Sequence, residues 1–436
     1  MANPVAQERS IVQRAKALRS IGLVLVIRAA GLVVSALSLI VVARTLGTEA
    51  YGAYGFVMAA AGLICVLGEA GMPQLLLREL ANARAHADWS RAKGIIRWAP
   101  LRLIFLACLA GTLVLLVVSA LPAGALPVSG SLLTLLPVLV IGMGLARLGQ
   151  SSLTGIGQAR LAVTIGFFVR PFVFLCLFAA VARLAGSVTA WDSLALQAAT
   201  SLIAVLLAAS LFWRNLPTPV RQARASFEGR STWWRRAFYL ALSASAFMVI
   251  GQADIVMLGL YRPLDEVGLY KVAAQGALLI GSAASAVVPL RVGSMIDAIA
   301  KCSPAAVRRQ IRSFRLIALA LVLPPYAILL VAGTWLVPLA FGANFADSLW
   351  PMLILGVPAI GEAMAGPLRH YHSLAGGEKR IAAYYGGAAL LNIALNLVLI
   401  PLAGMYGAAL ATLVSLTGVH AMVLLNCRLP APGTSA

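Results

Sequence analysis

The stretch IGLVLVIRAAGLVVSALSLIVVA, residues 21–43, is apolar throughout and carries a single charge, Arg28. At a rise of about 1.5 Å per residue, a helix of this length spans roughly 30 Å, the thickness of the hydrocarbon core of a bilayer. The stretch therefore predicts a membrane-spanning helix. A charge inside such a helix costs about 2.5–3.5 kcal/mol. Two interpretations of Arg28 stay open: it reaches the interface or pairs locally, or it faces a polar cavity.

The rest of the chain repeats this apolar design. Of its 436 residues, 61% are hydrophobic and only 11% are charged, and the mean hydropathy is +0.93. A soluble domain has about 25% charged residues. Because lipid satisfies no backbone hydrogen bonds, the spanning segments are expected to be helices. The composition predicts an all-α polytopic membrane protein.

Twelve apolar runs are predicted to span the membrane. They cover approximately residues 21–43, 52–72, 98–121, 131–152, 161–184, 193–213, 237–260, 268–290, 316–337, 348–370, 381–402 and 405–426. The longest polar segment follows the sixth run and is rich in arginine. We therefore predict an N-terminal lobe (residues 1–213), a cytoplasmic linker (214–236) and a C-terminal lobe (237–436).

The basic residues favour one orientation of these spans. Most of the 34 lysines and arginines fall in alternate segments, which puts them on one side of the membrane. This is the positive-inside pattern, and it predicts that both termini are cytoplasmic. The same clustering between apolar runs argues against nucleic-acid binding as the reason for the net charge of +20. The exceptions are Arg44, Arg183, Arg262 and Lys271 on the opposite side, and Arg28, Arg147 and Arg170 inside predicted spans.

The chain also contains internal similarity. EAYGAY (49–54) matches DEVGLY (265–270), and GQARLA (157–162) matches GEKRIA (377–382). Each match falls at the corresponding loop of a six-helix half. Six spans are an even number, so both halves enter the membrane from the same side. This predicts two parallel six-helix repeats with a substrate path between them.

The arginines inside spans are the main functional signal. By helical rise, Arg28, Arg147 and Arg170 lie roughly 8–13 Å from the inner face, and together they would cost on the order of 8–10 kcal/mol in lipid. They are therefore expected to face protein or water. Glu362 is expected to be able to neutralise one of them. The remaining positive charge suits an anionic ligand, and arginine fits phosphate oxygens with paired donors.

The other charges inside spans leave two interpretations open. Asp254 and Glu362 either bind a coupling proton or sodium ion, or form structural charge pairs with Lys271 or an arginine. The sequence has no Walker A motif and no acidic pair typical of a glycosyltransferase, so no cofactor and no catalytic residue is predicted. His370 and His372 have no acidic or thiol partner close in sequence, so no metal site is predicted there.

Three segments carry a family resemblance. They are ARTLGTEAYGAYGFVMAAAGLICVLGEAGMPQLLLREL (43–80), QADIVMLGLYRPLDEVGLYKVAAQ (252–275) and LNIALNLVLIPLAGMYGAALAT (391–412). In this order they resemble the polysaccharide-biosynthesis flippases of the Wzx type, within the MOP (MATE-like) superfamily. The resemblance implies a V-shaped bundle of two lobes with a cationic cavity, to which Arg28, Arg147 and Arg170 fit by type.

The resemblance also implies a function. Such flippases move an undecaprenyl-diphosphate-linked oligosaccharide across the bacterial inner membrane by alternating access, and they are not enzymes because no bond changes. The implied partners are the lipid-linked oligosaccharide, membrane lipids, a polysaccharide polymerase and glycosyltransferases. Two alternatives stay open. One is a MATE-type ion-coupled small-molecule exporter. The other is a non-transporting assembly factor whose basic segments, 78–102 and 291–315, dock glycosyltransferases.

Overall fold

The computed structural model describes residues 4–122, 124–228, 230–285, 288–300 and 303–427. These residues form helices joined by short turns, and no strand occurs among them. The elements are α1 (Pro4–Glu69), α2 (Met72–Ala85), α3 (Trp89–Ala120), α4 (Gly130–Leu133), α5 (Leu136–Gly155), α6 (Ala159–Val163), η1 (Thr164–Val169), α7 (Arg170–Ala185), α8 (Ala190–Asn215), α9 (Thr218–Gln222), α10 (Arg230–Tyr261), α11 (Leu264–Ser285), α12 (Val288–Ala300), α13 (Pro304–Phe341), η2 (Ala343–Ser348), α14 (Leu349–Leu374) and α15 (Glu378–Asn426).

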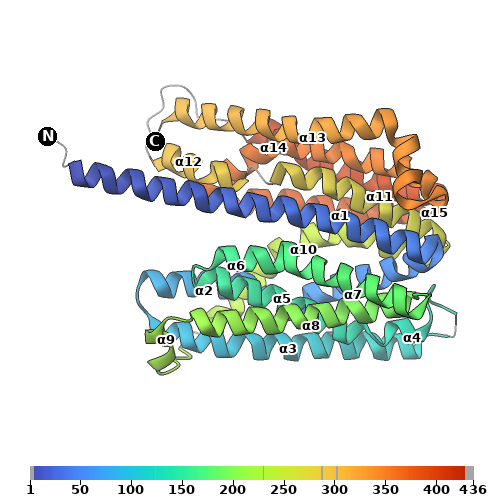
Figure 1. The fold of residues 1–436 in the computed structure, drawn as a ribbon, viewed down its shortest axis with the longest axis horizontal. Coiled ribbons are helices and arrows are strands. Elements are labelled where there is room, and N and C mark those ends of the chain that lie inside the picture. The colour runs from blue at the N-terminus through green and yellow to red at the C-terminus, as the bar shows by residue number, and fades with distance from the viewer. Residues whose placement is uncertain (1–3, 123, 229, 286–287, 301–302, 428–436) are drawn as a thin grey trace.

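The chain is a multi-pass membrane protein. Eight helical stretches within the described residues are long and apolar enough to cross a membrane. Two of them are interrupted by a glycine in the left-handed region, which glycine occupies at little cost. Gly47 has φ 73° and ψ 178° inside α1, and Gly404 has φ 54° and ψ −131° inside α15. Figure 1 shows the chain turning back within α1. The break at Gly404 confirms the predicted boundary between the runs 381–402 and 405–426.

One predicted span is not a single helix. The run 131–152 divides into α4 and α5, with Pro137 in the first turn of α5. The run 268–290 falls on α11, which reaches Ser285, and on the first residues of α12, which begins at Val288; residues 286–287 between them lie outside the described part of the chain. The basic segment after it is largely helical rather than a loop, since α12 and α13 cover most of residues 291–315.

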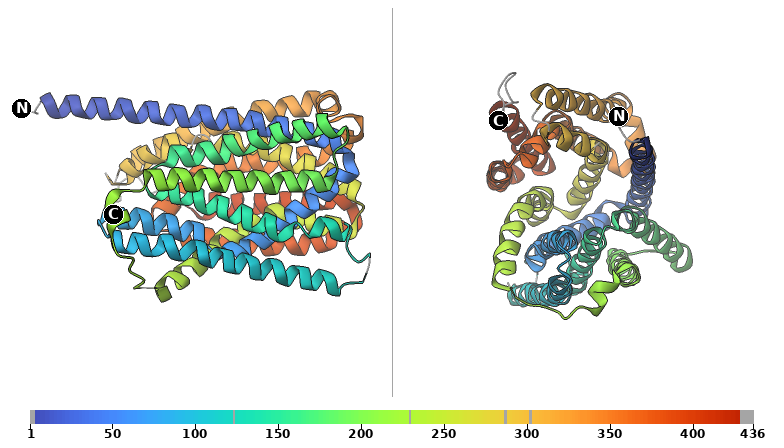
Figure 2. Two further views of the ribbon diagram at one scale, coloured as in Figure 1. Left: turned by 60° about the horizontal axis from the view of Figure 1, so that its bottom comes forward. Right: turned by 90° about the vertical axis from the view of Figure 1, so that its left-hand side faces the viewer.

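The helices gather in two groups. Figures 1 and 2 show α2–α8 on one side of the bundle and α11–α15 on the other, while α1 contacts both. One hydrophobic core combines residues of α1–α8 with residues 255–273, 337–353 and 400–409 of the second group. These C-terminal stretches surround the break at Gly404 and the turn before α11. A separate core lies wholly within residues 246–427 and includes the helix ends near the α12–α13 and α14–α15 turns. Among the described residues, the two groups share a core mainly at the bundle end that holds the glycine breaks, and the start of α10 joins the same core beside α2 and α3 through Trp233 and Ala237.

The two groups meet most closely where α1 crosses α11. A β-carbon on Gly52 would lie 2.7 Å from the carbonyl carbon of Leu264 and 2.9 Å from the nitrogen of Gly268. A β-carbon on Gly268 would lie 2.9 Å from the carbonyl carbon of Thr48 and 3.1 Å from the nitrogen of Gly52. Small residues allow such an approach between membrane helices. The contact is reciprocal, because the match of EAYGAY with DEVGLY aligns position 48 with 264 and position 52 with 268.

The second sequence match is displaced from the structural correspondence. The turn after α5 and the turn after α14 have the same hydrogen bonds: Gln158 N donates to Leu153 O at 2.8 Å, and Gly377 N donates to His372 O at 2.7 Å. The left-handed glycines of these turns are Gly157, with φ 90°, and Gly376, with φ 91°. Gly157 therefore corresponds to Gly376, and the sequence match was wrong to align it with Gly377.

Replacing Gly52 by alanine is expected to destabilise the protein by about 1–3 kcal/mol, because the new methyl group meets backbone atoms that cannot move away. Unfolding of the purified protein in detergent measures this. The matched control is Gly418→Ala, since a β-carbon there has no neighbour within 4 Å. Equal stability of the two variants would show that the α1–α11 crossing relaxes freely.

Candidate functional site

The end of α1 meets α5 through a charge pair. Arg147 Nη1 lies 3.1 Å from Glu69 Oε1 and 3.3 Å from Glu69 Oε2. The Glu69 side chain is only 8% exposed, whereas that of Arg147 is 30% exposed. The Cys65 thiol, one turn before Glu69, donates to the same carboxylate at 3.2 Å. Glu69 therefore compensates the charge of Arg147.

Sequence analysis did not single out Glu69. The sequence interpretation gave the neutralising role to Glu362, but the structure places Glu362 against Arg369, with Arg369 Nη2 2.5 Å from Glu362 Oε1. Glu69 lies near the end of the predicted span 52–72, within the sequence Gly-Glu-Ala-Gly, where a carboxylate is easily taken for an interfacial residue. The position of Glu69 inside an apolar run was the sequence feature that could have identified it as a buried charge.

Arg170 lies at the start of α7, directly after the π-helical turn η1. Pro171 has no N–H, so the helical hydrogen bond that this residue would donate is missing. π-turns of this kind are rare and occur often at functional sites. Arg170 Nη2 donates to Ser201 Oγ on α8 at 3.2 Å, and its buried Nε has no hydrogen-bond partner. The guanidinium groups of Arg170 and Arg147 are close enough to interact electrostatically.

Arg28 lies beside the same π-turn. Its guanidinium carbon is 5.0 Å from the centre of the Phe167 ring, a cation–π contact. Nearby on α1, a β-carbon on Gly31 would lie 2.7 Å from the carbonyl carbon of Phe167, so α1 and η1 pack at backbone distance. The Nε atom of Arg28 is buried and has no hydrogen-bond partner. Within the described part of the chain, no carboxylate pairs with Arg28.

The three predicted arginines therefore differ in their surroundings. Arg147 pairs with a carboxylate, whereas Arg170 donates to a hydroxyl group and Arg28 lies over an aromatic ring. Neither a hydroxyl group nor a ring carries a negative charge. Of these three arginines, Arg28 and Arg170 thus have no counter-ion among the described residues. A guanidinium group without a counter-ion can bind an anion through charge-assisted, paired hydrogen bonds.

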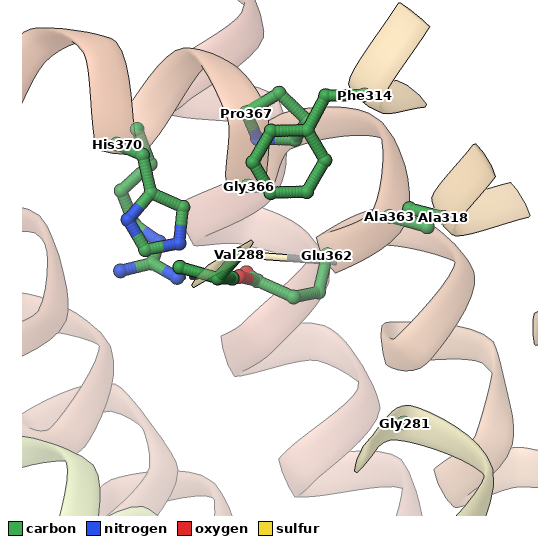
Figure 3. A pocket seen from close by; sticks show the side chains of 10 residues that line it. Gly281, Val288, Phe314, Ala318, Glu362, Ala363, Gly366, Pro367 and His370 are labelled. Carbon is green, nitrogen blue, oxygen red and sulfur yellow. Dashed lines mark hydrogen bonds and ion pairs between the residues drawn. The ribbon is translucent and has the colours of Figure 1, made fainter. Parts of the chain in front are cut away.

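Glu362 belongs to a second cluster, on the C-terminal side of the bundle. A cavity of about 200 Å³ is lined by Glu362, Arg369 and His370 together with apolar residues of α13 and α14, and Figure 3 shows Glu362, His370 and Phe314 around it. Besides Arg369, the carboxylate contacts His420 of α15, whose Nε2 lies 3.3 Å from Oε2. The His370 ring stacks on Phe314 at 6.1 Å between ring centres. Cationic or polar groups thus face Glu362 from two sides.

Asp254 lies on α10 and is almost fully buried. Its carboxylate accepts hydrogen bonds from Tyr270 Oη at 2.5 Å, from the backbone N–H of Ile255 at 2.8 Å, and from Thr412 Oγ1 at 3.4 Å. Lys271 is also buried and influences Asp254 electrostatically, but the described residues include no direct salt bridge between them. Asp254 is therefore held mainly by hydroxyl and backbone donors from α10, α11 and α15.

The model of a protein family, described as polysaccharide biosynthesis protein, matches residues 17–290 of the chain. The chain belongs to this family. No curated protein sequence matches it.

Solved structures show the same fold. An inward-facing multidrug resistance MATE family transporter of the MOP superfamily is 13% identical, with 92% of this chain and 96% of that chain covered and a TM-score of 0.69. The lipid II flippase MurJ in an inward closed conformation is 13% identical, with 92% and 86% covered and a TM-score of 0.72. The chain therefore has the fold of these transporters, and the family match together with this fold confirms the resemblance found in the sequence.

The pair of Glu69 and Arg147 is expected to show energetic coupling. Glu69→Gln and Arg147→Gln should each destabilise the protein, by about 1–3 kcal/mol, because each leaves a partly buried charge or donor unpaired. The double variant should be destabilised by less than the sum of the two single effects on the free energy of unfolding. Denaturant unfolding of all four proteins measures the coupling, and strict additivity would contradict a direct pair.

Tyr270→Phe is expected to destabilise the protein by about 1.5–3 kcal/mol, because the buried Asp254 loses a hydrogen bond to a charged group. The matched control is Tyr261→Phe, since Tyr261 lies at the end of α10 and is 50% exposed. Thermal unfolding in detergent compares the two. A shift of the same size in both variants would mean that the Tyr270 hydroxyl contributes nothing specific.

Proposed function

We propose that the protein is a flippase that moves an undecaprenyl-diphosphate-linked oligosaccharide repeat unit across the bacterial inner membrane for the synthesis of a surface polysaccharide. Membership of the polysaccharide biosynthesis protein family supports the pathway. The transporter fold supports translocation as the activity. No bond is made or broken in this process, so the proposed protein is not an enzyme.

One observation carries the proposal: the uncompensated positive charge of Arg28 and Arg170. A diphosphate esterified to a prenyl chain at one end and a sugar at the other is a dianion with several acceptor oxygens, and guanidinium groups match such oxygens with paired donors. Arg147, which interacts with Arg170 and is 30% exposed, adds a third donor beside Glu69. These three arginines are proposed to hold the diphosphate while the sugar head group crosses the bilayer.

The same charges disfavour a MATE-type exporter of organic cations. Such a substrate needs a carboxylate without a local counter-ion. Among the described residues of the spans, Glu69 is paired with Arg147 and Glu362 with Arg369, and the buried Asp254 lies close enough to the charge of Lys271 to interact with it electrostatically. For the same reason we propose that Asp254, Glu362 and Lys271 act as structural charge groups rather than as a site for a coupling ion.

The proposed architecture is twelve spans in two parallel six-helix repeats, with lobes 1–213 and 237–436 joined by the linker 214–236. The breaks at Gly47 and Gly404 support it, because each divides one long helix into two spans. The helices α10 and α11, of 32 and 22 residues, supply two further spans. The reciprocal contact of Gly52 with Gly268 and the matching turns after α5 and α14 support the repeat.

The proposed mechanism is alternating access. The two groups of helices share a core at the end with the glycine breaks, and toward the opposite end α11–α15 have a core of their own, while the start of α10 stays packed against the N-terminal helices. The start of α1 and the end of α15 lie at that opposite end (Figure 1). With the termini in the cytoplasm, as the basic segments favour, this arrangement suits entry of the head group from the inner leaflet. The prenyl tail stays in lipid, and rocking of the lobes exposes the head group to the other side.

Arg170→Gln is expected to reduce surface polysaccharide at least tenfold in a host that depends on this gene, because a charge-assisted contact is worth about 1.5–3 kcal/mol. Lipid-linked repeat units should accumulate on the inner leaflet. Arg28→Gln should act in the same direction. The measurements are surface polysaccharide, lipid-linked intermediates and the amount of protein in the membrane.

The matched control is Arg183→Gln, an exposed position in the last turn of the same helix as Arg170. It should leave polysaccharide unchanged. Normal polysaccharide with Arg170→Gln and Arg28→Gln at normal protein level would reject the diphosphate site. Normal polysaccharide after deletion of the whole gene would reject the flippase and favour an exporter.

A further inference from the structure

A second cavity, of about 380 Å³, lies on the flank of the N-terminal helices and is separate from the arginines inside the spans. It is bounded by α3, by the end of α8 and by the short helix α9, which Figure 1 places at the same end of the bundle as the start of α1. Its lining residues are Lys93, Ile96, Arg97, Trp213, Leu216, Val220 and Arg221. Three of these are cationic and none is acidic.

The hydrogen bonds of the cationic residues leave their charges uncompensated. Lys93 Nζ donates to the carbonyl oxygens of Arg221 at 2.6 Å and Ala223 at 2.7 Å. Arg221 in turn donates to the carbonyl oxygens of Trp213 and Arg214 at the end of α8. These partners are neutral, so they fix the side chains without cancelling the charge. Arg97 is exposed and has no recorded hydrogen bond or ion pair with any described residue.

The remaining wall of the cavity is apolar and lies at a membrane boundary. Ile96, Leu216 and Val220 form this wall. Trp213 lies near the end of a predicted span and is 56% exposed, as is typical of indole rings at the interface. One turn beyond Arg97 along α3, Leu101 is 68% exposed and continues the apolar surface toward the bilayer.

We propose that this cavity binds an anionic diacyl phospholipid, with its phosphodiester at Lys93, Arg97 and Arg221 and its acyl chains along the exposed apolar residues of α3. Basic pockets beside membrane helices bind anionic head groups in this way. The bound lipid would hold the chain between α8 and α10 in place, because this chain already contacts α3 through Lys93 and through Ser226 N, which donates to Ser90 O at 3.0 Å.

Lipid binding to the purified full-length protein in detergent tests the proposal. Native mass spectrometry and thermal unfolding are followed during titration with dioleoylphosphatidylglycerol, with dioleoylphosphatidylcholine and with inorganic phosphate. The wild-type protein should bind phosphatidylglycerol saturably and be stabilised by it, with little effect of phosphatidylcholine or phosphate. Arg97→Gln should weaken phosphatidylglycerol binding about fivefold. Because Arg97 is exposed, the variant should unfold like the wild type when no lipid is added.

The matched control is Arg102→Gln, which removes an exposed arginine of the same helix outside the cavity. It should bind phosphatidylglycerol like the wild type. Equal affinity of the Arg97→Gln and wild-type proteins would overturn the proposal, as would equal binding of phosphatidylglycerol and phosphatidylcholine. If inorganic phosphate stabilised the protein as strongly as the lipid, the cavity would be a site for a free anion and the phospholipid proposal would be rejected. None of these results depends on polysaccharide export.

Discussion

An arginine inside a membrane-spanning helix must be compensated by protein, water or a polar ligand, since the hydrocarbon of the bilayer has no acceptor for a guanidinium group. In this protein the compensation is incomplete on one side of the bundle. Glu69 meets Arg147, but Arg170 has only a hydroxyl group and Arg28 only an aromatic ring. The carboxylates of the other side, Asp254 and Glu362, are surrounded by donors. The charges inside the spans therefore leave an excess of positive charge in the N-terminal half, whereas the carboxylates Asp254 and Glu362 of the C-terminal half have cationic groups nearby. This difference is the reason for proposing an anionic substrate.

Much of this arrangement depends on α1. Its first part carries Arg28, its break at Gly47 returns the chain across the bundle, and its second part carries Gly52 and Glu69. The same helix therefore supplies a cation, the carboxylate of the charge pair and the closest approach to α11. In the proposed alternating access, any movement of one group of helices against the other would change this crossing. Backbone atoms of α1 and α11 are in direct contact there, with no side chains between them.

The sequence predicted the multi-pass helical fold, the break near Gly404 and the family, because span length, hydropathy and motif are properties of short segments, whereas the roles of Arg28, Arg147 and Arg170 stay predictions. It did not predict which groups pair. Arg147 and Glu69 lie far apart in the chain, and His420 reaches Glu362 from another helix. Such pairs depend on which helices meet. The π-turn before Arg170 and the correspondence of Gly157 with Gly376 were also missed, since backbone hydrogen bonds and not residue types define them.

The crossing of Gly52 and Gly268 has a consequence for the origin of the chain. Its contacts are isologous: position 52 touches the counterparts of the positions that position 268 touches. An isologous patch is self-complementary, and it is the kind of surface through which two identical subunits form a closed dimer. A chain of half this length, with one such glycine, could make the same crossing with a second copy of itself. Gene fusion would then have preserved an interface that already existed between separate molecules.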